Sequence, residues 1–150
     1  MRINIIDPKY LADNHLIAEY REMKMAPHFY LLLSKTKNGI DKRKISERYI
    51  LNKGHAFMWY DKMNFIKKRF DLILLEMKER GFKTNFDKLN FEGIPQEAFG
   101  DFSPNLDEKK INLERILLRI AKQPHWYKYK GKGKEDWNKF YKELLETNKL

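Results

Sequence analysis

No cysteine occurs in the 150-residue chain, and this absence excludes several kinds of chemistry. The protein has no disulfide, no thiolate nucleophile and no cysteine-ligated zinc. The histidines also lack the spacing of a metal site, because they are scattered along the chain at His15, His28, His55 and His125. We therefore expect no metal and no other cofactor. Any acid–base chemistry falls to carboxylates, amines or single histidines.

Long apolar runs are absent as well. A membrane-spanning helix needs roughly 20 consecutive apolar residues, and no stretch comes near that length. The N-terminus does not have the layout of a signal peptide, so we expect no membrane partner. Glycine and proline are sparse, with 7 and 5 residues, and alternating strand patterns are few. A chain of this length buries one modest core, so the sequence predicts a single compact all-α domain.

Apolar residues at helical spacing predict three principal helices. The first is expected to begin at Asp7 and Pro8, with aspartate as the N-cap and proline in the first turn. It carries an apolar stripe, is expected to kink at Pro27, and ends before Gly39.

The second and third helices frame a long loop. The second is expected to begin near residue 54 and to end at Gly81, and residues 82–104 are expected to wrap around the body. Asn105 is an N-cap candidate for the third helix, whose first turn is acidic, as the helix dipole favours. Pro124 ends this helix.

The C-terminal tail adds a fourth, short helix to this prediction. Its apolar side chains recur on one face, at Trp137, Phe140, Tyr141, Leu144 and Leu145. We assign residues 1–132 to the principal domain and expect residues 133–150 to pack on it as an extension.

Basic residues outnumber acidic ones by 31 to 21, which gives a formal charge of +10. Such an excess raises the local concentration of polyanions. Interleaved with the basic residues are 3 Trp, 8 Tyr and 10 Phe, a mixture that suits contacts to phosphates and to bases. Composition therefore favours a nucleic acid as the partner.

Two basic segments are candidates for that contact. In the run Trp126, Tyr127, Lys128 and Tyr129, rings could stack on bases while the ammonium group meets phosphate. In the third helix, Arg115 and Arg119 stand one turn apart, opposite the apolar stripe, and could follow a phosphate backbone. The alternatives are a solvated basic loop whose rings pack on the body, and solvated arginines on a helix face.

The first predicted helix offers a histidine and a carboxylate on one side. His15 and Glu22 lie seven residues apart, so they project in nearly the same direction. Arg21 lies about 100° around the helix from Glu22 and reaches the same cleft only from its edge. Taken alone, Glu22 is also explained as a surface carboxylate that balances Lys24, and His15 as a packing residue.

The N-terminal amine is a further candidate nucleophile. Terminal α-amines have a pKa of about 7.7–8.0, against about 10.4 for lysine, so a useful fraction is neutral near pH 7. An amine that attacks a sugar carbon forms a Schiff base without a metal. A frayed terminus with no role is the alternative.

These residues together resemble the bacteriophage-type pyrimidine-dimer DNA glycosylases, also called dimer-specific endonuclease V. The resemblance covers most of residues 1–132 and depends on the order and spacing of short segments. These are Arg2-Ile3-Asn4, Leu11-Ala12-Asp13, His15-Leu16, Ala18-Glu19-Tyr20-Arg21-Glu22, Gly54-His55, Tyr60-Asp61-Lys62, Arg80-Gly81-Phe82, Ile94-Pro95-Gln96-Glu97, Gly100-Asp101, Ile120-Ala121 and Trp126-Tyr127-Lys128-Tyr129.

The resemblance implies a three-helix fold and a two-step reaction on cyclobutane pyrimidine dimers. An N-terminal α-amine attacks C1′, an imine forms, and β-elimination then breaks the strand, which makes the enzyme both a glycosylase and an abasic-site lyase. Glu22 matches the essential carboxylate of the family. The basic positions that match its DNA-contacting or site-shaping groups are Arg2, His15, Arg21, Arg115 and Arg119.

Three departures from the family pattern affect this expectation. The family has a small residue after the initiator methionine, whereas Arg2 is bulky and blocks removal of Met1, so we expect retained Met1 to supply the attacking amine. A family arginine aligns with Met25, and Lys24 is the possible substitute. Residues 133–150 extend beyond the usual end of the family.

The expected partner is double-stranded DNA that contains pyrimidine dimers or abasic sites. We expect a monomer in the cytoplasm of a bacterium or a phage-infected cell, since a chain without cysteine fits a reducing compartment. Two alternatives remain at this point. One is a non-catalytic DNA-binding or DNA-bending protein on the same scaffold, and the other is a lyase for different lesions.

Overall fold

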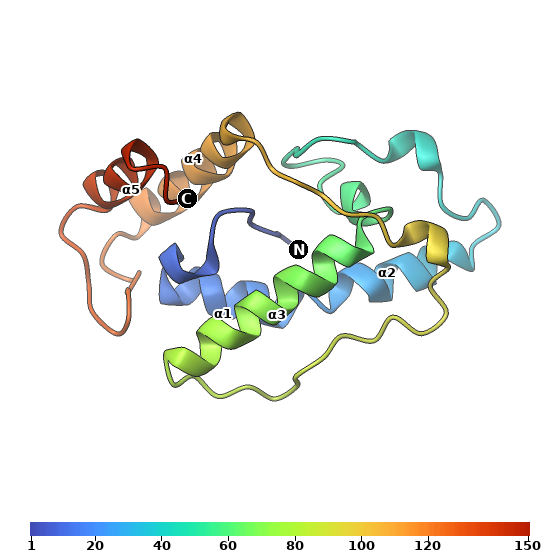
Figure 1. The fold of residues 1–150 in the computed structure, drawn as a ribbon, viewed down its shortest axis with the longest axis horizontal. Coiled ribbons are helices and arrows are strands. Elements are labelled where there is room, and N and C mark those ends of the chain that lie inside the picture. Colours follow the sequence, from blue (N-terminus) through green and yellow to red (C-terminus); the bar gives the residue numbers. More distant parts are fainter.

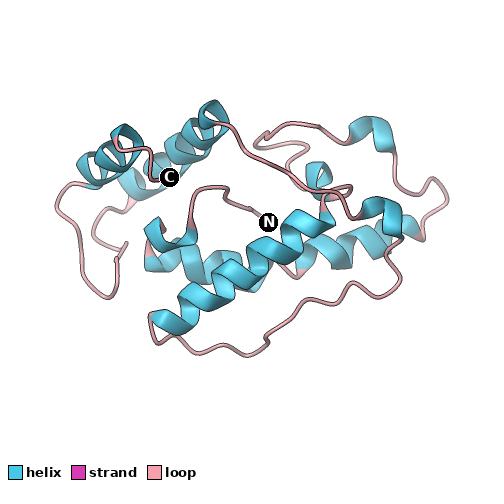
Figure 2. Ribbon diagram, viewed as in Figure 1, coloured by secondary structure: helices cyan, strands magenta, loops and turns pink.

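The computed structural model describes residues 1–150 and contains helices without any β-sheet (Figures 1 and 2). The predicted all-α class is confirmed. Short 3-10 turns join the α-helices, which are α1 (Asp13–Glu22), α2 (Met25–Ser34), α3 (Met63–Glu79), α4 (Leu106–Lys122) and α5 (Trp137–Glu146). No helix combines the length and the apolar character that crossing a membrane requires.

The first predicted helix is two helices, and its predicted start at Asp7 is wrong. Asp7 caps only a 3-10 turn, Pro8–Tyr10, after which Leu11 is extended and α1 begins at Asp13. The reason is a tertiary contact. The guanidinium of Arg80, which is distant in the sequence, donates hydrogen bonds to the carbonyl oxygens of Pro8, Lys9 and Leu11. Those oxygens are therefore unavailable for a helical ladder.

Pro27 interrupts the predicted first helix, as expected. The break is at Met23 and Lys24, because proline has no amide to donate to the Met23 carbonyl and its ring clashes with that carbonyl, and Pro27 itself lies in the first turn of α2. A first-turn residue has no intrahelical partner for its amide, so proline is tolerated there.

The second helix begins later than predicted, whereas the third begins where predicted. Residues 57–59 form a 3-10 turn, and α3 starts only at Met63. The Lys62 ammonium donates to the carbonyl oxygen of Met58 at 2.7 Å, so this oxygen of the 3-10 turn already has a hydrogen-bond donor. Asn105 caps α4 through a reciprocal capping box with Glu108, as its sequence indicated.

The core lies between α1, α3 and α4, and the termini run toward it. Its largest fully buried side chains include Trp59, Phe70 and Tyr141. In Figure 1 the chain start lies near the middle of the molecule, between α3 and α4. Helices α1 and α3 are in direct contact, and a buried ion pair between Glu19 and Arg69 joins them.

The long connection from α3 to α4 wraps around one side of the molecule, as predicted (Figure 2). Tyr20 on α1 holds it, because the Tyr20 hydroxyl donates to the carbonyl oxygen of Phe86 at 2.7 Å and accepts from its amide at 2.9 Å. Near its end, Gly100 passes so close to the Asp61 carbonyl that a Cβ would collide with it. This close approach explains why glycine occupies that position.

Helix α5 forms where the tail predicted an amphipathic helix, and it packs on α4. The Tyr141 hydroxyl donates to the carbonyl oxygen of Tyr10 at 2.7 Å, and the Lys109 ammonium to that of Leu150 at 2.6 Å. The division of the chain at residue 132 stays a prediction.

Candidate active site

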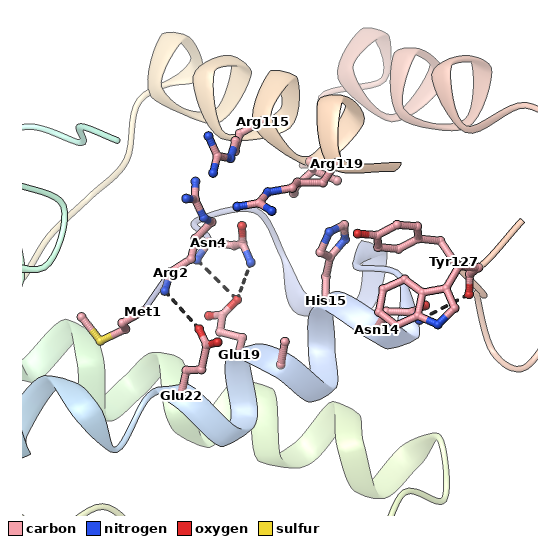
Figure 3. Close-up of a pocket in the computed structure, with 13 residues that line it drawn as sticks. Met1, Arg2, Asn4, Asn14, His15, Glu19, Glu22, Arg115, Arg119 and Tyr127 are labelled. Atoms are coloured by element: carbon pink, nitrogen blue, oxygen red, sulfur yellow. Dashed lines mark hydrogen bonds between the residues drawn. The ribbon is translucent and has the colours of Figure 1, made fainter. Parts of the chain in front are cut away.

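A cavity of about 320 Å³ opens between α1, α4 and the first residues of the chain. Figure 3 shows it with the side chains of α1 on one side and those of α4 on the other. The lining residues are Met1, Arg2, Asn4, Asn14, His15, Ala18, Glu19, Glu22, Arg115, Ile116, Arg119, Trp126 and Tyr127. Segments more than 100 residues apart in the sequence therefore share one cavity.

Helix α1 supplies one wall through a single face. His15, Glu19 and Glu22 follow one another at steps of four and three residues, which places them in a row along the helix. The spacing of His15 and Glu22 had indicated this face, and Glu19, between them, was missed although the same spacing contains it. Glu19 is buried and forms an ion pair with Arg69 of α3, with 2.7 Å between Oε2 and Nε.

Glu22 is at the mouth of the cavity beside the start of the chain. Its Oε2 accepts a hydrogen bond from the Arg2 amide at 3.2 Å. Met1, half-buried, directly precedes Arg2, so residue 1 and Glu22 line the same cavity (Figure 3). The amine itself forms no hydrogen bond or ion pair with that carboxylate.

The opposite wall is cationic. Arg115 and Arg119 project from α4 toward Arg2, as Figure 3 shows. Burial and the neighbouring Arg115 lower the pKa of the Arg2 guanidinium from its ordinary value. Three guanidinium groups that converge on one cavity favour an anionic ligand.

Buried polar atoms without hydrogen-bond partners gather in this cavity. They are Arg2 Nη1, His15 Nδ1 and Arg115 Nε, all of them on lining residues. Such atoms are rare in folded proteins because leaving them unpaired is costly. The guanidinium nitrogens are donors only, so the ligand that they fit offers oxygen acceptors.

His15 lies at the inner end of the cavity against Tyr127. Their ring centroids are 4.7 Å apart. Burial lowers the pKa of His15 to about 4, and the charges of Arg119 and Arg2 add to the effect. His15 is therefore a neutral imidazole near pH 7.

We expect the free energy of unfolding to fall as the pH drops from 7 to 5. Burial also lowers the pKa of His55 to about 4, whereas an unfolded histidine titrates near 6.5. Each lowered pKa contributes stability that is complete above pH 6.5 and is lost as the pH falls toward 4. The expected loss by pH 5 is about 1–2 kcal/mol per histidine.

Urea titrations at pH 7, 6 and 5 measure this loss. His15→Gln should reduce the pH dependence, and the same substitution at the exposed His28 should leave it intact. An equal slope in the His15→Gln protein and the wild type would contradict the expectation.

Four predicted DNA-binding residues lie outside the cavity. Arg21, Lys24 and Lys128 are exposed, and the Lys24 ammonium lies 5.4 Å from the centre of the Phe86 ring. Tyr129 is half-buried, and its hydroxyl donates to the carbonyl oxygen of Lys9 at 2.8 Å. Their contacts with DNA stay predictions.

Asn14 connects the cavity to the aromatic-basic run and was also missed. The side-chain Nδ2 of Asn14 donates to the carbonyl oxygen of Trp126 at 3.3 Å, and its Oδ1 accepts from the backbone amide of Lys128 at 3.0 Å. Trp126 remains exposed and Tyr127 is buried. Only tertiary structure shows this role, because Asn14 resembles any first-turn polar residue in the sequence.

No three side chains of the metal-binding types come together anywhere in the structure. The cavity instead combines the first residue of the chain, the carboxylates of Glu19 and Glu22, and a cationic wall. These features define an all-helical protein that holds its own N-terminus in a site suited to a polyanion.

Residues 1–90 match the family model of the pyrimidine dimer DNA glycosylases, and the chain belongs to this family. Membership implies that the protein is an enzyme with pyrimidine dimer DNA glycosylase activity and that damaged DNA is its substrate. The resemblance inferred from the sequence is thereby confirmed. The match includes Met1, His15 and Glu22 and ends before α4, so Arg115 and Arg119 lie outside it.

Proposed function

We propose that the protein is a bifunctional enzyme, a DNA glycosylase coupled to an abasic-site lyase, which acts on cyclobutane pyrimidine dimers. Its nucleophile is the α-amine of Met1. The observation that carries the proposal is that residue 1 and the Glu22 carboxylate line one cation-rich cavity. An amine nucleophile keeps the sugar covalently bound after the base has left, and this bond makes strand cleavage accessible.

In the first step, the amine nitrogen bonds to C1′ of the 5′ nucleotide of the dimer. The glycosidic C1′–N bond breaks, and its electron pair leaves on the base. Proton loss from the attacking nitrogen and opening of the sugar ring produce an imine. Glu22 stabilises the positive charge on the opening sugar and assists the proton transfers.

In the second step, a proton leaves C2′ and the C3′–O bond breaks by β-elimination, which releases the strand on the 3′ side. Water then hydrolyses the imine and frees the Met1 amine. The sequence of steps needs no oxidant or reductant. Glu22, whose carboxylate accepts from the amide of the residue after Met1, is the proposed base for the C2′ proton.

The cationic wall binds the damaged strand through its phosphates. The guanidinium groups of Arg2, Arg115 and Arg119 line the cavity, and their N–H groups are donors that phosphate oxygens satisfy. Exposed Trp126 offers a ring to the opened duplex. A dimer site, already distorted, is cheaper to open than an intact duplex.

Borohydride trapping tests the nucleophile. With EDTA present and a duplex that contains one dimer, reduction of the imine should leave a covalent protein–DNA adduct that maps to residue 1. Protein acetylated at its α-amine is the matched control and should yield none. The absence of an adduct, or an adduct on a lysine, rejects the mechanism, and binding without nicking identifies a non-catalytic DNA-binding protein.

The mature N-terminus is part of the same proposal. Because Arg2 is bulky, Met1 is retained and deformylated, and the mass of the intact protein measures this directly. We further propose that the enzyme acts as a monomer in the cytoplasm of a bacterium or a phage-infected cell, on dimers and on abasic sites.

A further inference from the structure

The first residues of the chain are held in an unusual way, by side chains at four successive amides. The Arg2 amide donates to Glu22 at 3.2 Å, and that of Ile3 donates to His55 Nε2 at 3.0 Å. The Asn4 amide donates to Glu19 Oε1 at 3.4 Å, and the Ile5 amide donates to Asn112 Oδ1 at 2.7 Å. No sheet partner is involved, since the structure has no sheet.

His55 is oriented to accept the Ile3 amide. It is buried, and its Nδ1 lies 2.7 Å from the carbonyl oxygen of Ile50. That oxygen only accepts, so Nδ1 carries the proton and Nε2 keeps a free lone pair for Ile3. The ring therefore has a defined tautomer: the contact with Ile50 fixes the proton on Nδ1, and the Ile3 amide binds the lone pair on Nε2.

Asn112 holds the next part of the segment from α4. It is fully buried, and its Nδ2 donates to Asn4 Oδ1 at 2.8 Å while its Oδ1 accepts from Ile5. Asn4 Nδ2 in turn donates to Glu19 Oε1 at 2.8 Å. This chain of hydrogen bonds joins α4, the start of the chain and α1 into one unit.

We infer that His55 and Asn112 are positioning residues for the Met1 amine. A chain terminus is disordered unless it is tied down, and these two side chains fix Ile3 and Ile5, two and four residues from the nucleophile. Catalysis by a placed nucleophile depends steeply on its position, and a misplacement of about 1 Å costs about a hundredfold in rate. The inference rests on the proposed function, because only that function makes the Met1 amine the nucleophile.

The rate of the chemical step separates positioning from binding. His55→Leu removes the acceptor of the Ile3 amide, and Asn112→Leu keeps the branched shape of the side chain but removes its hydrogen bonds to Ile5 and Asn4. Each should lower the single-turnover rate of strand incision at saturating enzyme by about tenfold to a hundredfold. The dissociation constant for the dimer duplex should stay within about threefold, since phosphate contacts set it. His55→Gln, which restores an acceptor, should recover most of the rate.

Tyr20→Phe is the matched control. It removes two hydrogen bonds of a buried side chain on the far side of α1, at Phe86, and should lower stability without changing the incision rate. All variants are compared below their unfolding temperatures. Rates within twofold of wild type, or a rate loss that Tyr20→Phe shares, overturn the positioning role.

Hydrogen exchange provides a readout that needs no variant. The amides of residues 3 to 5 should exchange as slowly as those of core helices, and rapid exchange in the wild type would overturn the inference. If wild-type enzyme forms no adduct at residue 1, the proposed function fails, and the positioning role fails with it. If wild type forms the adduct and the variants match its rate, only the positioning role fails.

Discussion

Replacement of Glu22 by glutamine should lower the rate of strand incision by about a hundredfold to a thousandfold, while binding of the dimer duplex changes only a few-fold. Glutamine keeps the shape and an oxygen that accepts from the Arg2 amide, so the start of the chain keeps its place. The substitution removes the negative charge that, in the proposed mechanism, faces the opening sugar, and it also removes the proposed base for the later proton transfers.

Single-turnover incision and equilibrium binding of a duplex with one dimer measure the two effects separately. Glu79→Gln is the matched control, because it changes the net charge equally at an exposed position at the end of α3. Incision by the Glu22→Gln enzyme within twofold of wild type would remove Glu22 from the mechanism.

Loss of Arg69 should be the most destabilising single change beneath the site. Arg69 and Glu19 have side-chain exposures of only 4% and 1%, and Arg69 Nη1 also donates to the carbonyl oxygen of Ile6. Arg69→Met leaves the Glu19 carboxylate buried without its counter-ion. Such a loss costs about 3–5 kcal/mol, a large share of the roughly 5–15 kcal/mol that stabilises a domain.

Urea unfolding at pH 7 measures this cost. Arg43→Met is the control, because Arg43 pairs with Asp41 on the surface, and it should leave the unfolding free energy nearly unchanged. Adding Glu19→Gln to Arg69→Met removes the unpaired charge and should recover part of the loss. A cost below about 1 kcal/mol for Arg69→Met would show that water or a rearranged cation reaches Glu19.

The sequence correctly predicted those helices whose ends depend on residues within one turn, such as the start of α4. Asn105 and Glu108 form their capping box within one turn, and the apolar face of the tail needs only a neighbour to become α5. Asp7 and Pro8 carry an equally strong local signal, yet Arg80, 72 residues away from Pro8, takes the carbonyl oxygens there. A long-range contact overrode the local preference.

The residues of the candidate site also fall into two groups, those that the sequence predicted and those that only the tertiary structure shows. His15 and Glu22 share a helix face, so their spacing alone placed them together, and one-turn spacing did the same for Arg115 and Arg119. The buried supports could not be found by periodicity. Asn112 interrupts an apolar stripe like many tolerated polar residues, and its partner Ile5 lies 107 residues earlier in the chain.

That separation governs when the site comes into being during synthesis. Because synthesis runs from the N-terminal side, Ile5 emerges 107 residues before its acceptor Asn112, and the guanidinium groups of Arg115 and Arg119 on α4 follow still later. A nascent chain halted before α4 has the α1 wall of the cavity without the Asn112 acceptor and without the cationic wall. The cavity between α1 and α4 is therefore assembled only after α4 has been made.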